Sequence, residues 1–122
     1  MRQVTGSINT IPVTIQVLET LVEFREGARI FEIKHNNGLL FNFGKPQVLL
    51  MENSNVPYDL KVLYFHKFSK YGIVDRVETM KANTYGPYSS IYFYDVCLEL
   101  SDDFCAKNKI GVGSILTLND SL

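Results

Sequence analysis

The chain has 122 residues, a formal net charge of -1 at pH 7, and 46% hydrophobic against 20% charged residues. This length allows one domain and is too short for two, and the composition is that of a globular chain, which excludes disorder. The balanced charge argues against a protein that binds nucleic acid mainly through the phosphates. No apolar run is long enough to cross a bilayer. We therefore expect one domain over residues 1–122.

The N-terminal half contains strand and helix signals in clear succession. Apolar and polar side chains alternate from Ile11 to Leu18, which predicts a half-buried strand. The Thr-x-x-Glu sequence at Thr20 is a capping box, and with Gly27 it predicts a helix of about two turns. Two apolar segments follow at 39–43 and 47–51, and Gly44-Lys45-Pro46 divides them.

The middle of the chain is typical of a β-hairpin. Pro57 opens a segment that alternates to about Phe68, and the turn at 69–72 leads into a partner strand from Ile73 to Met80. The segment from Ala82 to Ser90 contains Gly86-Pro87, and we expect it to be a loop.

The C-terminal part returns to a long strand, a helix and a last strand. Apolar residues alternate from Ile91 to Leu100. Ser101 then caps a short helix to about Asn108, and Ile115–Leu118 is a closing strand. The fold class we expect is mainly β: a small curled sheet or barrel of six or more short strands with two short helices.

Several blocks of this sequence occur in the same order in one known family. They are Glu19-Thr20 to Gly27, Gly38-Leu39-Leu40-Phe41-Asn42-Phe43, Met51 to Asp59, Tyr71-Gly72-Ile73-Val74, Leu98-Glu99-Leu100, and Lys109 to Ser114. In their order and spacing these blocks resemble the family named domain of unknown function 192, which consists of small β-rich proteins of bacteria, archaea and some phages. The resemblance implies a β-rich fold and no defined activity. The chain departs from the family pattern at Glu52, where the family has Lys, and at Tyr58, where it has Leu.

The irregular segment from Met51 to Asp59 is the first candidate ligand site. Glu52 and Asp59 are able to bind a cation or a polar ligand that Asn53 orients. The alternative is structural, because Asn and Asp side chains commonly hydrogen-bond the loops that precede a proline.

Other polar residues have weaker functional signals. The carboxylates could form a catalytic pair, but solvated outward positions on strands explain them more simply. The histidines lie in turn-like places without metal-ligand spacing, and we expect no metal and no cofactor. The two cysteines are expected to be buried free thiols. The residues concerned are Asp59, Asp75, Glu78, Glu99, His35, His66, Cys97 and Cys105.

Two aromatic segments suggest binding surfaces. From Lys61 to Arg76, cations alternate with aromatics, which suits single-stranded nucleic acid, although a solvated hairpin with core aromatics is the simpler explanation. A tyrosine-rich segment suits a protein interface, since Tyr is enriched there. The candidate interface residues are Tyr85, Tyr88, Tyr92 and Tyr94.

The residues as a whole favour a non-enzymatic binding or assembly module that has a protein partner or self-associates. Because the resembled family also occurs in some phages, one form of such a module is a structural component of a phage virion. A metal- or ligand-dependent enzyme that uses the Met51–Asp59 loop is the alternative, and binding of single-stranded nucleic acid is a weaker one. Residues 1–7 contain no apolar stretch of the signal-peptide kind, so we expect a cytoplasmic or virion location and no membrane partner.

Overall fold

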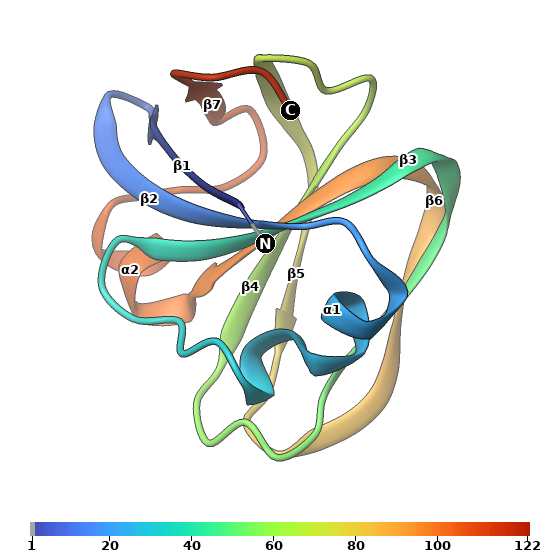
Figure 1. Cartoon of the computed structure of the whole chain (residues 1–122). Coiled ribbons are helices and arrows are strands. Elements are labelled where there is room, and N and C mark those ends of the chain that lie inside the picture. Colours follow the sequence, from blue (N-terminus) through green and yellow to red (C-terminus); the bar gives the residue numbers. More distant parts are fainter. Residues whose placement is uncertain (1) are drawn as a thin grey trace.

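The computed structural model describes residues 2–122, which form seven strands and three short helical segments (Figure 1). In chain order these are β1 (Arg2–Ile8), β2 (Ile11–Leu18), α1 (Leu21–Glu26), the 3-10 turn η1 (Gly27–Arg29), β3 (Asn37–Asn53), β4 (Leu60–Phe65), β5 (Tyr71–Met80), β6 (Thr84–Ser101), α2 (Asp102–Lys107) and β7 (Ile115–Leu118). The fold is mainly β with two short α-helices, as the alternation of apolar residues predicts.

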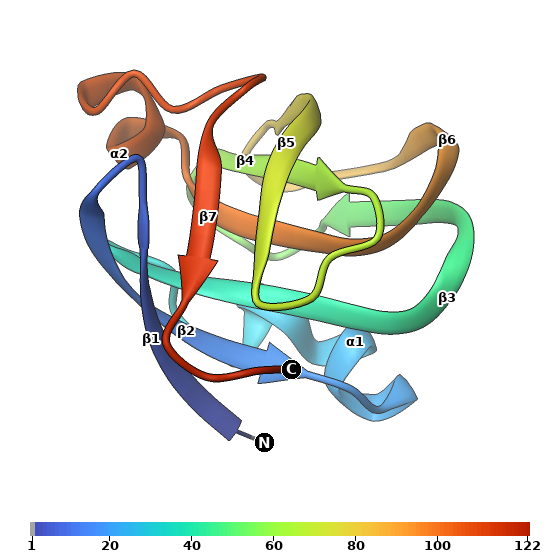
Figure 2. The same ribbon diagram turned by 90° about the horizontal axis from the view of Figure 1, so that it is seen from above.

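The strands form a closed barrel in the order β1-β2-β3-β6-β4-β5-β7, and β7 closes it by pairing with both β5 and β1 (Figure 2). All of these pairs are antiparallel except β2 with β3, which run parallel. A parallel pair requires a crossover, and α1 and η1 lie in that connection. The crossover therefore places α1 over one side of the sheet.

The capping box predicted at the start of α1 is present. The Thr20 hydroxyl accepts a hydrogen bond from the Glu23 backbone N–H at 3.2 Å, and the Glu23 carboxylate accepts one from the Thr20 N–H at 3.0 Å. Gly27 follows the helix with φ 44°, a conformation that glycine adopts without the steric cost of a Cβ. The chain thus turns sharply from α1 into η1.

The strands β3 and β6 are longer than the sequence indicated. The segments expected at 39–43 and 47–51 belong to one strand, and the Gly44-Lys45-Pro46 interruption falls at a shift of register between β3 and β6. The prediction of a loop from Ala82 to Ser90 is wrong, because β6 begins at Thr84 and pairs with β3 there. Register shifts of this kind accommodate Gly and Pro within a sheet. The outer parts of the two strands, residues 47–53 and 84–94, form a two-stranded arm.

Two apolar cores lie on opposite faces of the sheet. Residues such as Ile15, Leu40, Leu98 and Leu100 form one cluster, and Leu39, Phe41, Val62 and Cys97 belong to the other, which is closed by Phe24 of α1 and neighbouring partly buried residues. The strand β6 contributes to both clusters because both of its faces are covered. Cys97 and Cys105 are buried and free, which confirms the prediction from their surroundings. None of the helices within residues 2–122 has the length and apolar character needed to cross a bilayer.

Candidate functional site

Asn53, at the end of β3, holds the bend that precedes β4. Its side chain is 1% exposed, and its Nδ2 donates to the backbone carbonyls of Tyr58 at 3.0 Å, Met80 at 3.4 Å and Lys81 at 3.1 Å. Three backbone carbonyls around the bend gain a donor in this way, and the Lys81 carbonyl also accepts from the Thr84 hydroxyl at 2.6 Å. The amide group therefore stabilises the Met51–Asp59 bend itself.

The other two candidate residues of this bend are engaged in different contacts. Asp59 accepts a hydrogen bond from the Ala82 backbone N–H at 2.8 Å, and this bond is the main reason that the pKa of its carboxyl lies below the ordinary value. Glu52 instead faces Arg29, with 4.0 Å between Oε1 and Nη2. Asn53 and Asp59 thus bind backbone around the bend, and Glu52 lies at the edge of a separate pocket.

The four candidate interface tyrosines are divided by the structure. Tyr85 and Tyr92 are 66% and 60% exposed. Tyr88 is partly buried, and its hydroxyl contacts the Thr84 hydroxyl at 2.7 Å. Tyr94 is 1% exposed, so the expectation that all four face outward is wrong for Tyr94, which stacks on Tyr64 in the core with ring centroids 5.1 Å apart.

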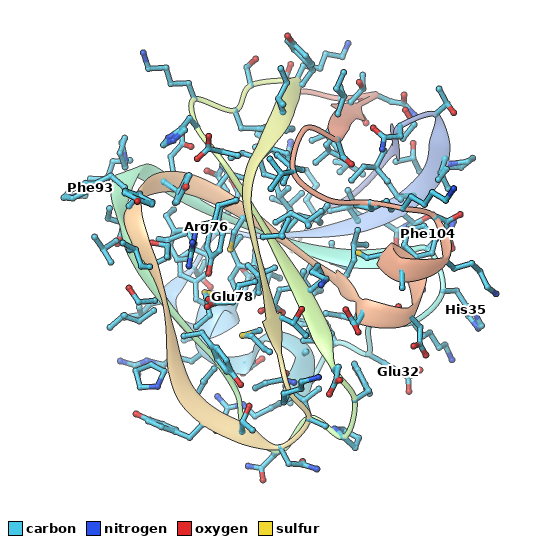
Figure 3. All side chains as sticks on the ribbon, turned by 180° about the vertical axis from the view of Figure 1, so that it is seen from behind. Glu32, His35, Arg76, Glu78, Phe93 and Phe104 are labelled. Carbon is cyan, nitrogen blue, oxygen red and sulfur yellow. The ribbon has the colours of Figure 1, made fainter. Side chains whose placement is uncertain are left out.

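Exposed apolar residues accompany Tyr85 and Tyr92 on the β3–β6 arm. We name this surface the arm patch. Figure 3 shows Phe93 projecting outward at the outer edge of the arm. Large apolar side chains gathered on one element are typical of interaction surfaces, whereas scattered ones are not. The residues of the arm patch are Val48, Leu50, Tyr85, Ile91, Tyr92 and Phe93.

A pocket of about 660 Å³ lies between the α1–η1 segment and β3, and we name it the α1 pocket. Its apolar lining includes three phenylalanines, one from α1 and two from β3. Phe24 lies 6.0 Å from Phe41 and 4.5 Å from Phe43 between ring centroids, and the two β3 rings are 6.1 Å apart. Leu49 and Met51 continue this lining. A volume and lining of this kind are typical of small-molecule sites.

Glu99 of β6 lines the same pocket and is 3% exposed. In the two adjacent ladders it pairs in register with Leu39 of β3 and Val62 of β4. Within residues 2–122 its carboxylate has no hydrogen-bond or ion-pair partner. Desolvation by these apolar neighbours raises the pKa of Glu99 to about 8. The interpretation of Glu99 as a solvated outward carboxylate is therefore wrong, because α1 and η1 cover the side of the sheet that it faces.

Asp75 and Glu78, two further candidate carboxylates, form contacts of their own. Asp75 accepts a hydrogen bond from the Tyr94 hydroxyl at 2.6 Å and lies 3.3 Å from His66 Nε2. Glu78 lies beside Arg76, with 4.0 Å between Oε2 and Nη2, and Figure 3 shows these two side chains together. The Tyr94–Asp75 bond joins β6 to β5, whereas Arg76 and Glu78 both lie on β5, and Glu99 takes no part in these contacts.

A second pocket, of about 760 Å³, lies between α2 and the segment before β3. Glu32, His35 and Phe104 line it and lie on the same side of the molecule in Figure 3. Its charged groups are solvated, as in the exposed pair Lys34–Glu32 at 2.8 Å. In the described part of the chain, no three His, Cys, Asp or Glu side chains come together in a way that could hold a metal ion.

Sequence reasoning missed Glu99 because it treated one face of the last long strand as solvated. The available signal was the helix predicted at Thr20, which must cover some sheet face. A carboxylate between Leu98 and Leu100, two positions after Cys97, has apolar neighbours on both sides in sequence. Buried acids without partners are rare and mark candidate functional positions.

Comparisons with solved structures agree on the fold. One similar structure is that of a suggested transcription regulator from Sinorhizobium meliloti 1021, with a TM-score of 0.79 and 16% identity over 95% of this chain and 92% of that one. Another is a protein of unknown function from Novosphingobium aromaticivorans DSM 12444, with a TM-score of 0.74 and 15% identity over 93% and 82%. At such identities these likenesses concern the fold alone.

No curated protein matches the sequence. Residues 4–118, nearly the whole chain, match the model of a family described as an uncharacterised group of conserved proteins. This match agrees with the order of the sequence blocks from Glu19 to Ser114. The chain belongs to the DUF192 family.

Proposed function

We propose that the protein is a binding module whose ligand occupies the α1 pocket. The observation that supports this most is Glu99, a 3% exposed carboxyl without a partner in the described chain that lines a cavity with many apolar side chains. Leaving such a group unsatisfied costs folding free energy, of the order of 1–3 kcal/mol or more. That cost is offset when the carboxyl group pairs with a ligand from outside the chain.

The contacts of the Met51–Asp59 bend give less support to an enzyme built on that loop. The Asn53 amide donates to three backbone carbonyls, and the Asp59 carboxylate accepts from a backbone N–H. These donor and acceptor groups stabilise the loop, whereas Asn53 Oδ1 is buried without a hydrogen-bond partner among the described residues. We retain Glu52 as a ligand-binding candidate, because it reaches the α1 pocket.

Single-stranded nucleic acid is also less well supported. Tyr64 and Phe65, two of the aromatics that would stack on bases, are fully buried. The Lys61 ammonium lies 3.2 Å from Asp102 and is also bound to Thr79. Stacking requires exposed ring faces, and phosphate binding requires free cations.

Two alanines allow a matched test of the pocket proposal. Ala28 lines the α1 pocket, and Ala106 is exposed on α2 outside it. Ala28→Trp should fill the pocket, whereas Ala106→Trp adds the same volume elsewhere. Phenylbutanol serves as the probe, and ¹H–¹³C NMR of the methyl groups of Leu49, Met51 and Val56 reports its binding.

We expect phenylbutanol to shift these methyl signals in the wild type and in Ala106→Trp. In Ala28→Trp the affinity should fall about tenfold or more, because the indole occupies the ligand's volume. Equal binding by Ala28→Trp, or shifts confined to other parts of the molecule, would contradict the proposal.

A second candidate function is assembly with another copy of the chain through the arm patch. Among the described residues, 47–53 of β3 pair only with β6, and 84–94 of β6 pair only with β3. The arm therefore combines two unpaired strand edges with exposed apolar side chains, and unpaired edges favour pairing with an identical edge. The net charge of -1 offers little repulsion between copies.

Sedimentation velocity across a concentration series tests this second candidate. Phe93 and Val112 are similarly exposed, at 63% and 68%, but only Phe93 lies on the arm patch. Phe93→Lys should shift the protein toward the monomer, and Val112→Lys should leave the association unchanged. A wild-type protein that stays monomeric at every concentration would rule out self-assembly through the arm.

A further inference from the structure

The lining of the α1 pocket has an uneven distribution of charge. Glu99 is flanked in the adjacent strands by the apolar residues Leu39 and Val62, and the pocket lining itself includes the apolar side chains of Phe41, Leu49 and Met51. The formally charged groups, Arg25, Glu26, Arg29 and Glu52, are two positive and two negative. These four offset one another, and the α1 pocket is left with the single negative group that Glu99 provides when ionised.

Glu99 receives no compensation from the protein. Desolvation alone accounts for its shifted pKa, and none of the four charged groups named above contributes to it. Its strand neighbour Cys97 is a buried thiol whose pKa is raised by burial, so it stays neutral. An ionised buried carboxylate is stable only when it is paired and hydrogen-bonded. The pairing group therefore has to come from outside the chain.

We propose that the α1 pocket binds a ligand with an apolar, aromatic-sized body and a cationic N–H end that pairs with Glu99. This inference rests on the proposed function, since it names the ligand class of the same pocket. The body packs on Phe24, Phe41 and Phe43, whose ring faces also attract a cation. The cationic end donates a charge-assisted hydrogen bond to the carboxylate. A ligand with a carboxylate end is repelled at the same point.

Ligand binding of this kind releases a proton. With a pKa of about 8, the carboxyl of free Glu99 is mostly protonated at pH 7. A bound cation favours the ionised form and lowers that pKa. Each binding event at pH 7 then releases about 0.9 proton. At pH 9 much less than one proton is released per bound ligand, because Glu99 is already ionised. A neutral ligand that accepts a hydrogen bond from protonated Glu99 releases none.

Three matched probes test the ligand class by isothermal titration calorimetry: phenylbutylamine, phenylbutanol and phenylbutanoate. They share one apolar body and differ in the end group. Titration in two buffers with different ionisation enthalpies measures the protons released. We expect phenylbutylamine to bind about tenfold or more tightly than phenylbutanol, with phenylbutanoate the weakest, and proton release to accompany only the amine.

A pair of variants assigns the effect to Glu99. Glu99→Gln should lose the preference for the amine and the proton release while it still binds phenylbutanol. Glu32→Gln, a 64% exposed side chain outside the α1 pocket, should retain both. If Glu99→Gln does not fold, the proton release of the wild-type protein still decides the question.

The outcomes separate the two proposals. If the amine and the alcohol bind equally and no proton is released, the cationic ligand class is wrong and the pocket proposal stands. If none of the three probes binds, both proposals fail. An amine preference that persists in Glu99→Gln would place the cation elsewhere and overturn the role of Glu99.

Discussion

Glu99 of β6 lies directly opposite Val62 of β4, so that a carboxyl group and an aliphatic side chain share one position in a buried ladder. Cross-strand neighbours of this kind usually match in polarity, because their side chains are in contact. The mismatch has a physical explanation when Glu99 is viewed from the α1 pocket, whose lining it joins. This relationship leads to the first prediction.

The stability of the protein should fall as pH rises from about 4.5 to about 8. The pKa of Glu99 is raised in the folded state, so the folded protein holds a proton there that the unfolded chain releases above pH 4.5. The contribution of Glu99 to the free energy of unfolding is complete below its pKa in the unfolded chain. It is lost as the pH approaches its pKa in the folded protein. The slope is about 1.4 kcal/mol per pH unit, or roughly 3 kcal/mol between pH 5 and pH 7.5.

Urea unfolding at several pH values, for wild type and Glu99→Gln, isolates this contribution. The amide does not titrate, so the difference between the two proteins should change with pH, and the variant should gain relative to the wild type as pH rises. Parallel stability curves for the two proteins would show that Glu99 titrates normally in the fold.

Asn53→Ala should destabilise the protein by about 2–4 kcal/mol. The substitution removes the amide that donates to three backbone carbonyls, one in a buried and two in part-buried hydrogen bonds. Asn36→Ala is the matched control, since Asn36 makes one exposed hydrogen bond to the Pro12 carbonyl at 3.2 Å and should cost less than about 0.5 kcal/mol. Guanidinium unfolding measures both, and similar small losses would contradict the role given to Asn53.

Tyr94→Phe should cost about 1 kcal/mol, and Tyr92→Phe should cost almost nothing. Only Tyr94 is buried, and its hydroxyl donates to the Asp75 carboxylate at 2.6 Å. The estimate is small because Asp75 is half-exposed and water replaces part of the lost bond. Thermal unfolding of the two variants distinguishes them, and equal melting temperatures would show that the Tyr94–Asp75 bond contributes no stability.

The regular elements could be predicted because local chemistry determines them. The alternation from Ile11 to Leu18, the capping box at Thr20 and the Ser101 cap appear in the structure where the sequence indicated them. The strand β1 was not expected, because its segment around Gly6 has little apolar alternation. Only the barrel explains this glycine, since a Cβ there would clash with the Thr117 carbonyl of β7.

The candidate sites depended on information that alternation does not contain. Tyr92 and Tyr94 are two positions apart and would share a face of a regular strand, yet one is exposed and the other buried. Ser90, Ile91 and Tyr92 lie within the register shift between Ser89 and Phe93, and such shifts re-aim the side chains near them. Likewise, the burial of Glu99 follows from the position of α1, which is a tertiary contact that one strand's sequence cannot reveal.

The most direct measurement is the pKa of the Glu99 side chain, obtained from the ¹³C carboxyl shift in a pH titration of ¹³C-glutamate-labelled protein. Glu99→Gln identifies the signal by its loss. The expected midpoint is about 8, and saturating phenylbutylamine should lower it, because the ammonium group stabilises the carboxylate. A midpoint near 4.5, as for a solvated carboxyl, would contradict a desolvated, unpaired Glu99 and with it the proposed ligand site.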